Sequence, residues 1–273
     1  MVGLAEGGVE VADADAVFGT SAGAFVGAQV ALGVALAGTL LALTDAAGRV
    51  AASAGDSMGE RMQAYLEGVN AAALSQQSVE EARGVLGRRA LESSVPSERE
   101  FLGFFSVFEG TDWPEGFACT AVDTETGEFV VWGAGSGVDL RRAVASSCSL
   151  PCVYPPVTIG GRRYMDGGMR TTLNADLAAG HDSVLAVSVT GLSAPAEGSN
   201  PGLDVLLSRL TAQLAALRSS GSAVEVIEPS AEFLEIGEWR TALMDVTKAA
   251  DAYEAGVRQG RKEAPRIAGL WSR

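Results

Sequence analysis

The sequence places a serine between two glycines, in Gly19-Thr20-Ser21-Ala22-Gly23. This spacing matches the G-x-S-x-G motif of a nucleophile elbow, in which the serine stands on a sharp turn between a strand and a helix. We expect this turn to be so tight that a side chain at either Gly19 or Gly23 would clash. The turn would present the Ser21 hydroxyl at the strand end. The following helix would then direct its N-terminus, including the Ala22 N–H, at developing negative charge.

The same motif occurs a second time, around Ser57 in Gly55-Asp56-Ser57-Met58-Gly59. The residues before each serine distinguish the two matches. Ser21 follows an apolar run that ends in Val17-Phe18, and a long apolar segment follows it, as the elbow requires. Ser57 follows Val-Ala-Ala-Ser-Ala, which is a poor strand, and has an acidic neighbour. We therefore assign the nucleophile to Ser21.

A nucleophilic serine needs a base, and the strongest candidate is Asp166, in Tyr-Met-Asp166-Gly167-Gly168. The segment before it, 157–165, is typical of a hairpin that turns at Gly160-Gly161. Gly167 and Gly168 allow a tight bend and leave room beside the carboxylate. The alternative is an aspartate in a solvated turn, which is the usual setting of an Asp-Gly pair.

The chain contains a single histidine, His181. One histidine excludes metal sites built from several histidines and limits any Ser-His-Asp triad to this residue. The chain order Ser21, Asp166, His181 is that of the α/β hydrolases, so a triad is a competing hypothesis. His181 lies in Ala-Gly-His-Asp just before a predicted strand, and we expect it to be a surface turn residue at the start of that strand.

The composition restricts the classes of partner. The 273 residues carry a formal net charge of -14, which argues against binding to nucleic acid and implies repulsion from an anionic membrane. Hydrophobic residues make up 47% and charged residues 20%, as in ordinary globular proteins. Three irregularly spaced cysteines and a start without basic residues favour a cytoplasmic protein with reduced thiols.

Short β-rich runs alternate with longer helical patterns, which favours an α/β fold with a largely parallel sheet covered by helices. We expect strands at 14–18, 117–122, 128–132, 183–189 and 223–227. We expect helices at 22–43, 58–73, 79–91, 140–147, 203–217 and 239–262.

Two regions allow alternative interpretations. Residues 22–44 carry no charge and are long enough to cross a bilayer, but their glycines and the preceding turn motif favour a buried helix. Residues 45–115 contain helical patterns without a convincing strand and end in the aromatic run 101–108. This helical insertion is either a cap over a substrate pocket or, as we favour, a region whose aromatic residues pack into the core.

Several segments together resemble the patatin-like phospholipases, over roughly residues 4–180. Ser21 in Gly-Thr-Ser-Ala-Gly and Asp166 in Asp-Gly-Gly look like the two signatures of that family. The stretches 119–127 and 143–156 are also similar to it, and Asn174 after the Asp-Gly-Gly fits its pattern. The resemblance implies a three-layer α/β fold in one acyl hydrolase domain, 1–273.

The resemblance also implies a mechanism. Ser21 would attack an acyl ester carbonyl and Asp166 would accept its proton directly, in a Ser-Asp dyad without histidine, metal or organic cofactor. Gly19, Ala22, Gly23, Gly167 and Gly168 would support the two residues and the oxyanion. The substrate would be a lipid ester, cleaved by phospholipase A, lysophospholipase or esterase activity during transient contact with a lipid surface.

The sequence departs from the family pattern at its start. Patatin-like proteins carry a glycine-rich loop after their first strand, and the N–H groups of this loop form the oxyanion hole. No such loop is visible before Ser21, and Gly7-Gly8 resembles the end of the helix that would follow the loop. We expect a misassigned start, a truncated chain or a catalytically inactive relative. The alternative function is therefore a non-catalytic lipid-binding or scaffolding protein.

Overall fold

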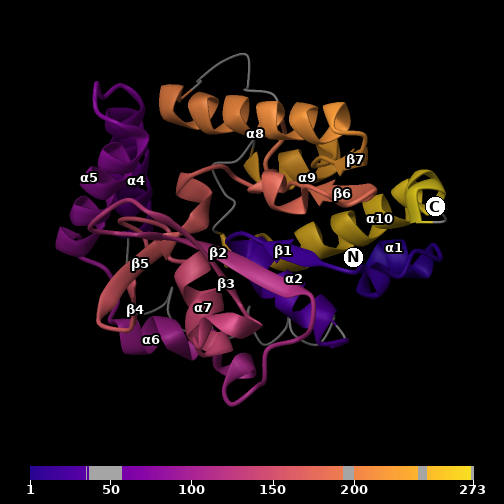
Figure 1. The fold of residues 1–273 in the computed structure, drawn as a ribbon, viewed down its shortest axis with the longest axis horizontal. Coiled ribbons are helices and arrows are strands. Elements are labelled where there is room, and N and C mark those ends of the chain that lie inside the picture. Colours follow the sequence, from indigo (N-terminus) through magenta and orange to yellow (C-terminus); the bar gives the residue numbers. More distant parts are fainter. Residues whose placement is uncertain (35, 37–56, 193–199, 239–244, 272–273) are drawn as a thin grey trace.

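The computed structural model describes the chain except for residues 35, 37–56, 193–199, 239–244 and 272–273. Its main sheet has five strands, and a separate sheet has two. The main sheet contains β1 (Val17–Gly19), β2 (Phe117–Asp123), β3 (Phe129–Gly133), β4 (Val157–Ile159) and β5 (Arg162–Asp166). The smaller sheet contains β6 (Ser183–Val187) and β7 (Ala223–Ile227). Figure 1 shows helices arranged around both sheets.

Strand β2 organises the main sheet because three strands pair with it. Strand β3 is antiparallel to residues 118–122 of β2 and occupies one edge. Strand β1 is parallel to residues 117–119 of β2, and β5 is antiparallel to residues 121–123. Since β3 overlaps both of these stretches, β1 and β5 share the opposite edge of β2. Their carboxyl ends therefore approach each other from opposite directions and meet beside Thr120.

Helices cover both faces of the main sheet. Successive side chains of β2 point to opposite faces, and those on each face are buried against helices. Cys119 and Ala121 pack in one core with α2 (Ala22–Ala31) and α7 (Leu140–Ser147). Val122 packs in the other core with Met165 of β5 and with three helices on that face. These helices are α4 (Ser57–Ala73), α5 (Val79–Glu92) and α8 (Pro201–Ser219).

The predicted fold class is confirmed, but the prediction of a largely parallel sheet is wrong. Only β1 with β2 and β6 with β7 pair in parallel in the part of the chain that the structure describes. The pairs β2–β3, β2–β5 and β4–β5 are antiparallel. Short turns at 124–128 and 160–161 join β2 to β3 and β4 to β5, and a turn of that length can only connect antiparallel neighbours. The antiparallel pairing of β2 with β5 is a tertiary contact between strands far apart in the sequence.

The aromatic run of the helical insertion packs into the core, as favoured. It spans α6 (Glu98–Gly103) and the residues after it. Phe101, Phe105 and Phe108 are buried, and Phe25 of α2 contacts the rings of Phe105 and Phe108 edge to face. The described residues between 57 and 108 are helices and connecting turns, without a strand.

Other helices differ from prediction in their ends. Helix α2 stops at Ala31, and residues 37–43 of the predicted helix lie outside the described residues. No helix in the described ranges combines the length and apolar character that crossing a bilayer needs. The helix α9 (Ala231–Ile236) was not predicted. Residues 239–244 of the last predicted helix lie outside the described residues, and α10 spans Ala249–Trp271, so it continues beyond the predicted end at residue 262.

The first and last helices of the described chain lie side by side, where α1 (Val2–Glu6) packs against α10 (Figure 1). The helices approach closely at two glycines. A Cβ atom at Gly3 would lie 2.0 Å from the Val257 carbonyl oxygen, and one at Gly260 would lie 2.9 Å from the Gly3 backbone.

Candidate active site

Ser21 stands on the turn between β1 and α2 in a strained backbone conformation, with φ 55° and ψ -128°. Positive φ is rare for a residue with a side chain, and such strain is concentrated at functional sites. A Cβ atom at Gly19 would lie 2.4 Å from the Ala24 Cα, so glycine is required there as predicted. A Cβ atom at Gly23 would meet nothing within 4 Å, so the predicted clash at that position is wrong.

The end of α7 holds both backbone polar groups of Ser21. The Ser21 N–H donates to Ser147 Oγ over 3.0 Å, and the Cys148 thiol donates to the Ser21 carbonyl oxygen over 3.0 Å. Ser147 is fully buried, so water does not compete for its hydroxyl. We call Ser147 and Cys148 the backbone clamp. The motif search missed these residues, because no local pattern links positions 147 and 148 to position 21.

Asp166 is the last residue of β5 and is only 1% exposed. Its Oδ1 accepts a hydrogen bond of 2.7 Å from the Gly168 N–H, whereas Oδ2 is buried without a hydrogen-bond partner. Burial raises the pKa of Asp166 to about 6, and the Ser21 hydroxyl and the Gly168 N–H offset part of that rise. The Ser21 side chain therefore faces the carboxylate, although no hydrogen bond of good geometry joins it to Oδ2. A carboxyl group with this pKa is a far better base at neutral pH than an exposed aspartate.

A buried polar network joins the backbone next to Ser21 to the backbone next to Asp166. Thr20 Oγ1 and Thr120 Oγ1 lie 2.9 Å apart, so the residue before Ser21 is joined to the centre of β2. The Asn174 side-chain amide donates to Thr20 Oγ1 over 3.1 Å and to the Gly167 carbonyl oxygen over 3.2 Å. A Cβ atom at Gly167 would lie 2.1 Å from Thr120 Oγ1, so glycine is required there. This network fixes the backbone after Asp166 relative to the backbone before Ser21.

The Asn174 side chain also accepts a hydrogen bond, which comes from Arg170. Arg170 donates to Asn174 Oδ1 over 3.1 Å and pairs with Asp176 through two hydrogen bonds of 2.8 and 2.7 Å. The Arg170 guanidinium also lies over the Phe129 ring, 4.4 Å from its centre. Sequence analysis identified Asn174 through the family resemblance but missed Arg170, Thr20 and Thr120. An arginine or threonine in isolation carries no signal of such a role.

Ala22, Gly168 and Ser57 are the other residues that the two motifs singled out. Ala22 is the first residue of α2, and its N–H has no acceptor among the described residues. Gly168 holds Asp166 through its N–H. Ser57 is the first residue of α4, and the residues directly before it lie outside the described ranges.

His181 precedes β6, as predicted, and its ring lies 6.2 Å from that of Phe18. Its carbonyl oxygen accepts a hydrogen bond from the Ser222 hydroxyl. No contact joins His181 to Ser21 or Asp166 in the described structure, so the geometry does not bring a triad together.

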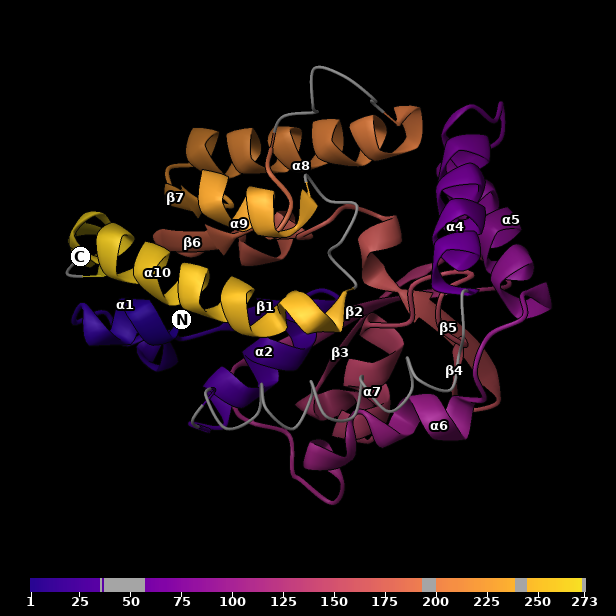
Figure 2. The same ribbon diagram turned by 180° about the vertical axis from the view of Figure 1, so that it is seen from behind.

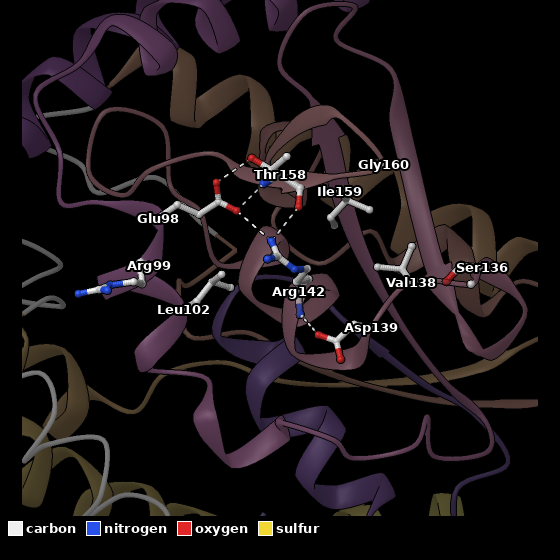
Figure 3. Close-up of a pocket in the computed structure, with 11 residues that line it drawn as sticks. Glu98, Arg99, Leu102, Ser136, Val138, Asp139, Arg142, Thr158, Ile159 and Gly160 are labelled. Carbon is white, nitrogen blue, oxygen red and sulfur yellow. Dashed lines mark hydrogen bonds and ion pairs between the residues drawn. The ribbon is translucent and has the colours of Figure 1, made fainter.

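A cavity of about 860 Å³ lies at the other end of α7 (Figure 3). Glu98 accepts hydrogen bonds from Arg142 and from the backbone and side chain of Thr158, and these groups line its wall. Ser21 and Asp166 do not line it, and Ser147 lies five residues beyond the lining residue Arg142, about 7.5 Å along the axis of α7. Among the described residues, no group of three or more His, Cys, Asp or Glu side chains is arranged to hold a metal ion.

Comparison with known proteins identifies the family. The family model described as patatin-like phospholipase matches residues 4–179, which is more than half of the chain and includes Ser21, Asp166 and Asn174. Among curated proteins, no sequence matches this chain significantly. The chain therefore belongs to the patatin-like phospholipases, a family of lipid acyl hydrolases.

Proposed function

We propose that the protein is a serine acyl hydrolase of lipid esters, with Ser21 as nucleophile and Asp166 as general base. The observation that carries this proposal is the pairing of a strained serine with a fully buried carboxylate whose Oδ2 has no other partner. Both groups are fixed through β2 and α7, so little reorganisation is needed before reaction. The substrate class is a phospholipid, lysophospholipid or neutral ester.

In the proposed reaction, Asp166 accepts the Ser21 proton while Ser21 Oγ attacks the ester carbonyl carbon. The tetrahedral oxyanion accepts a hydrogen bond from the Ala22 N–H at the positive end of α2. Collapse breaks the carbonyl–alkoxide bond, and the leaving alcohol takes the proton from Asp166. Water then attacks the acyl-serine with Asp166 again as base, which releases the carboxylic acid and restores the Ser21 hydroxyl.

The proposal also covers the cofactors, location and partners of the protein. No step calls on a metal or organic cofactor. The three cysteines are free thiols, which fits a cytoplasmic location. A net charge of -14 disfavours nucleic acid as a partner, and contact with a lipid surface would be transient and through apolar side chains.

A second function has one observation in its favour. The family's glycine-rich loop is not visible before Ser21, which leaves the Ala22 N–H at the start of α2 as the oxyanion donor that the motif supplies. Loss of one oxyanion donor typically costs about 10² to 10³ in rate. A lipid-binding protein without turnover would therefore keep this site and bind lipid esters without cleaving them.

The dyad predicts which substitutions abolish turnover of p-nitrophenyl butyrate and lysophosphatidylcholine. Ser21→Ala and Asp166→Asn should each lower kcat at least about 10³-fold, because they remove the nucleophile or its base. His181→Ala should leave kcat within about twofold, since the imidazole takes no part. A loss of several orders of magnitude in His181→Ala would instead establish a triad.

The pKa of Asp166 predicts the pH profile. The base acts only when ionised, so kcat/KM should fall about tenfold per pH unit below pH 6 and level off above it. An exposed aspartate would place the same inflection near pH 3.9. Measuring kcat/KM between pH 4.5 and 8 with a soluble ester tests this. A flat profile down to pH 4.5 would contradict the assignment of the base.

The backbone clamp predicts a loss of kcat without a change of KM. Ser147→Ala removes the acceptor for the Ser21 N–H, and we expect kcat to fall about 10- to 100-fold because the nucleophile is less well oriented. Cys148→Ser keeps a donor for the Ser21 carbonyl and should retain more activity than Cys148→Ala.

Ser146→Ala is the matched control for the clamp. Ser146 is also a buried hydroxyl on α7, but it bonds to Trp132 Nε1 and the Ala143 carbonyl instead of Ser21. Its removal should destabilise the fold to a similar extent and leave kcat nearly unchanged. Equal kinetic effects of Ser147→Ala and Ser146→Ala would show that α7 has only a structural role.

A further inference from the structure

An arginine stands on the apolar face of α4. Arg61 shares this face of the helix with Met58, three positions before it, and with Tyr65, four positions after it. Met58 and Tyr65 pack in the core cluster that contains Met165 of β5. Figure 2 shows α4 beside β5 in this part of the molecule. Arg61 therefore belongs to the face of α4 that packs on the strand ending in Asp166.

Arg61 has no counter-charge within the described part of the chain. The residue is half-buried, and no carboxylate pairs with it there, although the chain carries 34 acidic side chains. The Arg61 Nε atom is enclosed by protein without a hydrogen-bond partner. Its Nη1 and Nη2 atoms also lack a partner in the described ranges, but they are not enclosed, so a molecule from solution can reach them. A half-buried guanidinium without an anion is unfavourable, and its planar donors match a phosphate group.

Two tyrosine hydroxyls lie in the same region. Burial and the Asp166 charge raise the pKa of Tyr65. Burial and the neighbouring Cys148 raise the pKa of Tyr154, and the Arg61 guanidinium offsets part of that rise. Both phenols therefore stay protonated at neutral pH and are hydrogen-bond donors. Neither hydroxyl has a hydrogen-bond partner among the described residues, and neither is enclosed by protein.

The segment that carries Tyr154 is tied to the backbone of Asp166. The Asp166 N–H donates to the Ser149 carbonyl oxygen over 2.9 Å, and the Ser149 hydroxyl donates to the Pro155 carbonyl oxygen over 2.8 Å. Between them, Cys152 has a φ of 65°, which is rare for a residue with a side chain. These contacts fix Tyr154 close to the proposed base, on the side of β5 where it packs in one cluster with Tyr65.

We propose that Arg61, Tyr65 and Tyr154 bind a phosphate diester of the substrate while its acyl ester lies at Ser21. The substrate class is therefore a glycerophospholipid or lysophospholipid and not a neutral ester. This inference rests on the proposed acyl hydrolase function, since it assigns the headgroup of the ester that Ser21 would attack. The guanidinium and the phenols supply charge-assisted hydrogen bonds to the phosphate oxygens, whereas a glycerol ester offers Arg61 no charge.

The first experiment measures binding without turnover. Dodecylphosphocholine carries a phosphate diester and an alkyl chain but no carboxylic ester, and the ether dodecylglycerol is its neutral counterpart. Calorimetric titration of the full chain with each compound, below its micelle concentration, gives the two Kd values. In Arg61→Gln, we expect the Kd of dodecylphosphocholine to rise about 10- to 100-fold, as for loss of a hydrogen bond to a charged group. The Kd of dodecylglycerol should stay the same.

Further variants separate the site from the fold. Tyr65→Phe keeps the packed ring and should raise the Kd of dodecylphosphocholine about 3- to 10-fold. Arg61→Lys keeps the charge without the planar fork and should fall between wild type and Arg61→Gln. Arg99→Gln is the matched control, because Arg99 is an exposed arginine that lines the cavity at the other end of α7. It removes the same charge and should leave both Kd values unchanged.

The second experiment measures headgroup selectivity in hydrolysis. The ratio of kcat/KM for lysophosphatidylcholine to kcat/KM for monolauroylglycerol should fall about 10- to 100-fold in Arg61→Gln. The ratio should not change in Arg99→Gln. A general loss of folding or of catalysis would lower both kcat/KM values together and leave the ratio as it is.

Unchanged affinity for dodecylphosphocholine in both Arg61→Gln and Tyr65→Phe would overturn the site, as would an equal loss in Arg99→Gln. Inorganic phosphate that binds as tightly as dodecylphosphocholine would overturn the assignment to a lipid headgroup. Because binding needs no turnover, a failure of the proposed catalysis would appear as Arg61-dependent binding without ester hydrolysis.

Discussion

The site depends on two strands that end beside the same residue of β2. Strand β1 runs parallel to β2 and ends opposite Cys119, while β5 runs antiparallel and ends opposite Ala121. The residue between them, Thr120, contacts the turn after β1 through Thr20 and leaves room only for glycine at position 167. Two segments more than 140 positions apart in sequence are thereby aligned by one strand. The mixed pairing of the sheet is thus a requirement of the site, because two parallel neighbours could not meet end to end on one edge.

The sequence contains signals for the two proposed catalytic residues but few signals for the residues that position them. Ser21 and Asp166 were found because glycines in fixed spacing mark tight turns around them. Helices such as α7 and strands such as β7 were predicted at their observed bounds, since their apolar periodicity is clear. The sheet was predicted as largely parallel because alternating patterns do not encode which strands pair. The support from Thr120 and Ser147 arises only from tertiary structure, and no local pattern could reveal it.

The glycines of the two motifs differ in the space around them. At Gly19 and Gly167 a side chain would collide with neighbouring atoms, so the motif reflects a steric requirement. At Gly23 the space is open, and nothing in the described structure explains the glycine. Two glycines of one short motif therefore differ, because only one of them stands where a side chain would clash. Only the surrounding packing distinguishes them.

Stability and reactivity oppose each other at Asp166. Its pKa of about 6 in the folded protein exceeds the value near 3.9 of an unfolded chain, so folding disfavours its ionised form. The cost to stability is fully present above pH 6, decreases as the pH falls, and disappears below about pH 4. The hydrogen bond from Gly168 limits this cost on Oδ1, while Oδ2 has no hydrogen-bond partner in the described structure. A buried carboxylate in this state is well suited to accept a proton from the serine.

Covalent labelling can show whether Ser21 is a nucleophile and whether Asp166 activates it. A fluorophosphonate probe reacts with activated serines, and mass spectrometry of the digested protein locates the adduct. If Asp166 activates Ser21, we expect a single adduct on Ser21 that forms much more slowly in Asp166→Asn. An adduct on Ser57, no adduct at all, or labelling of Ser21 at an unchanged rate in Asp166→Asn would contradict it.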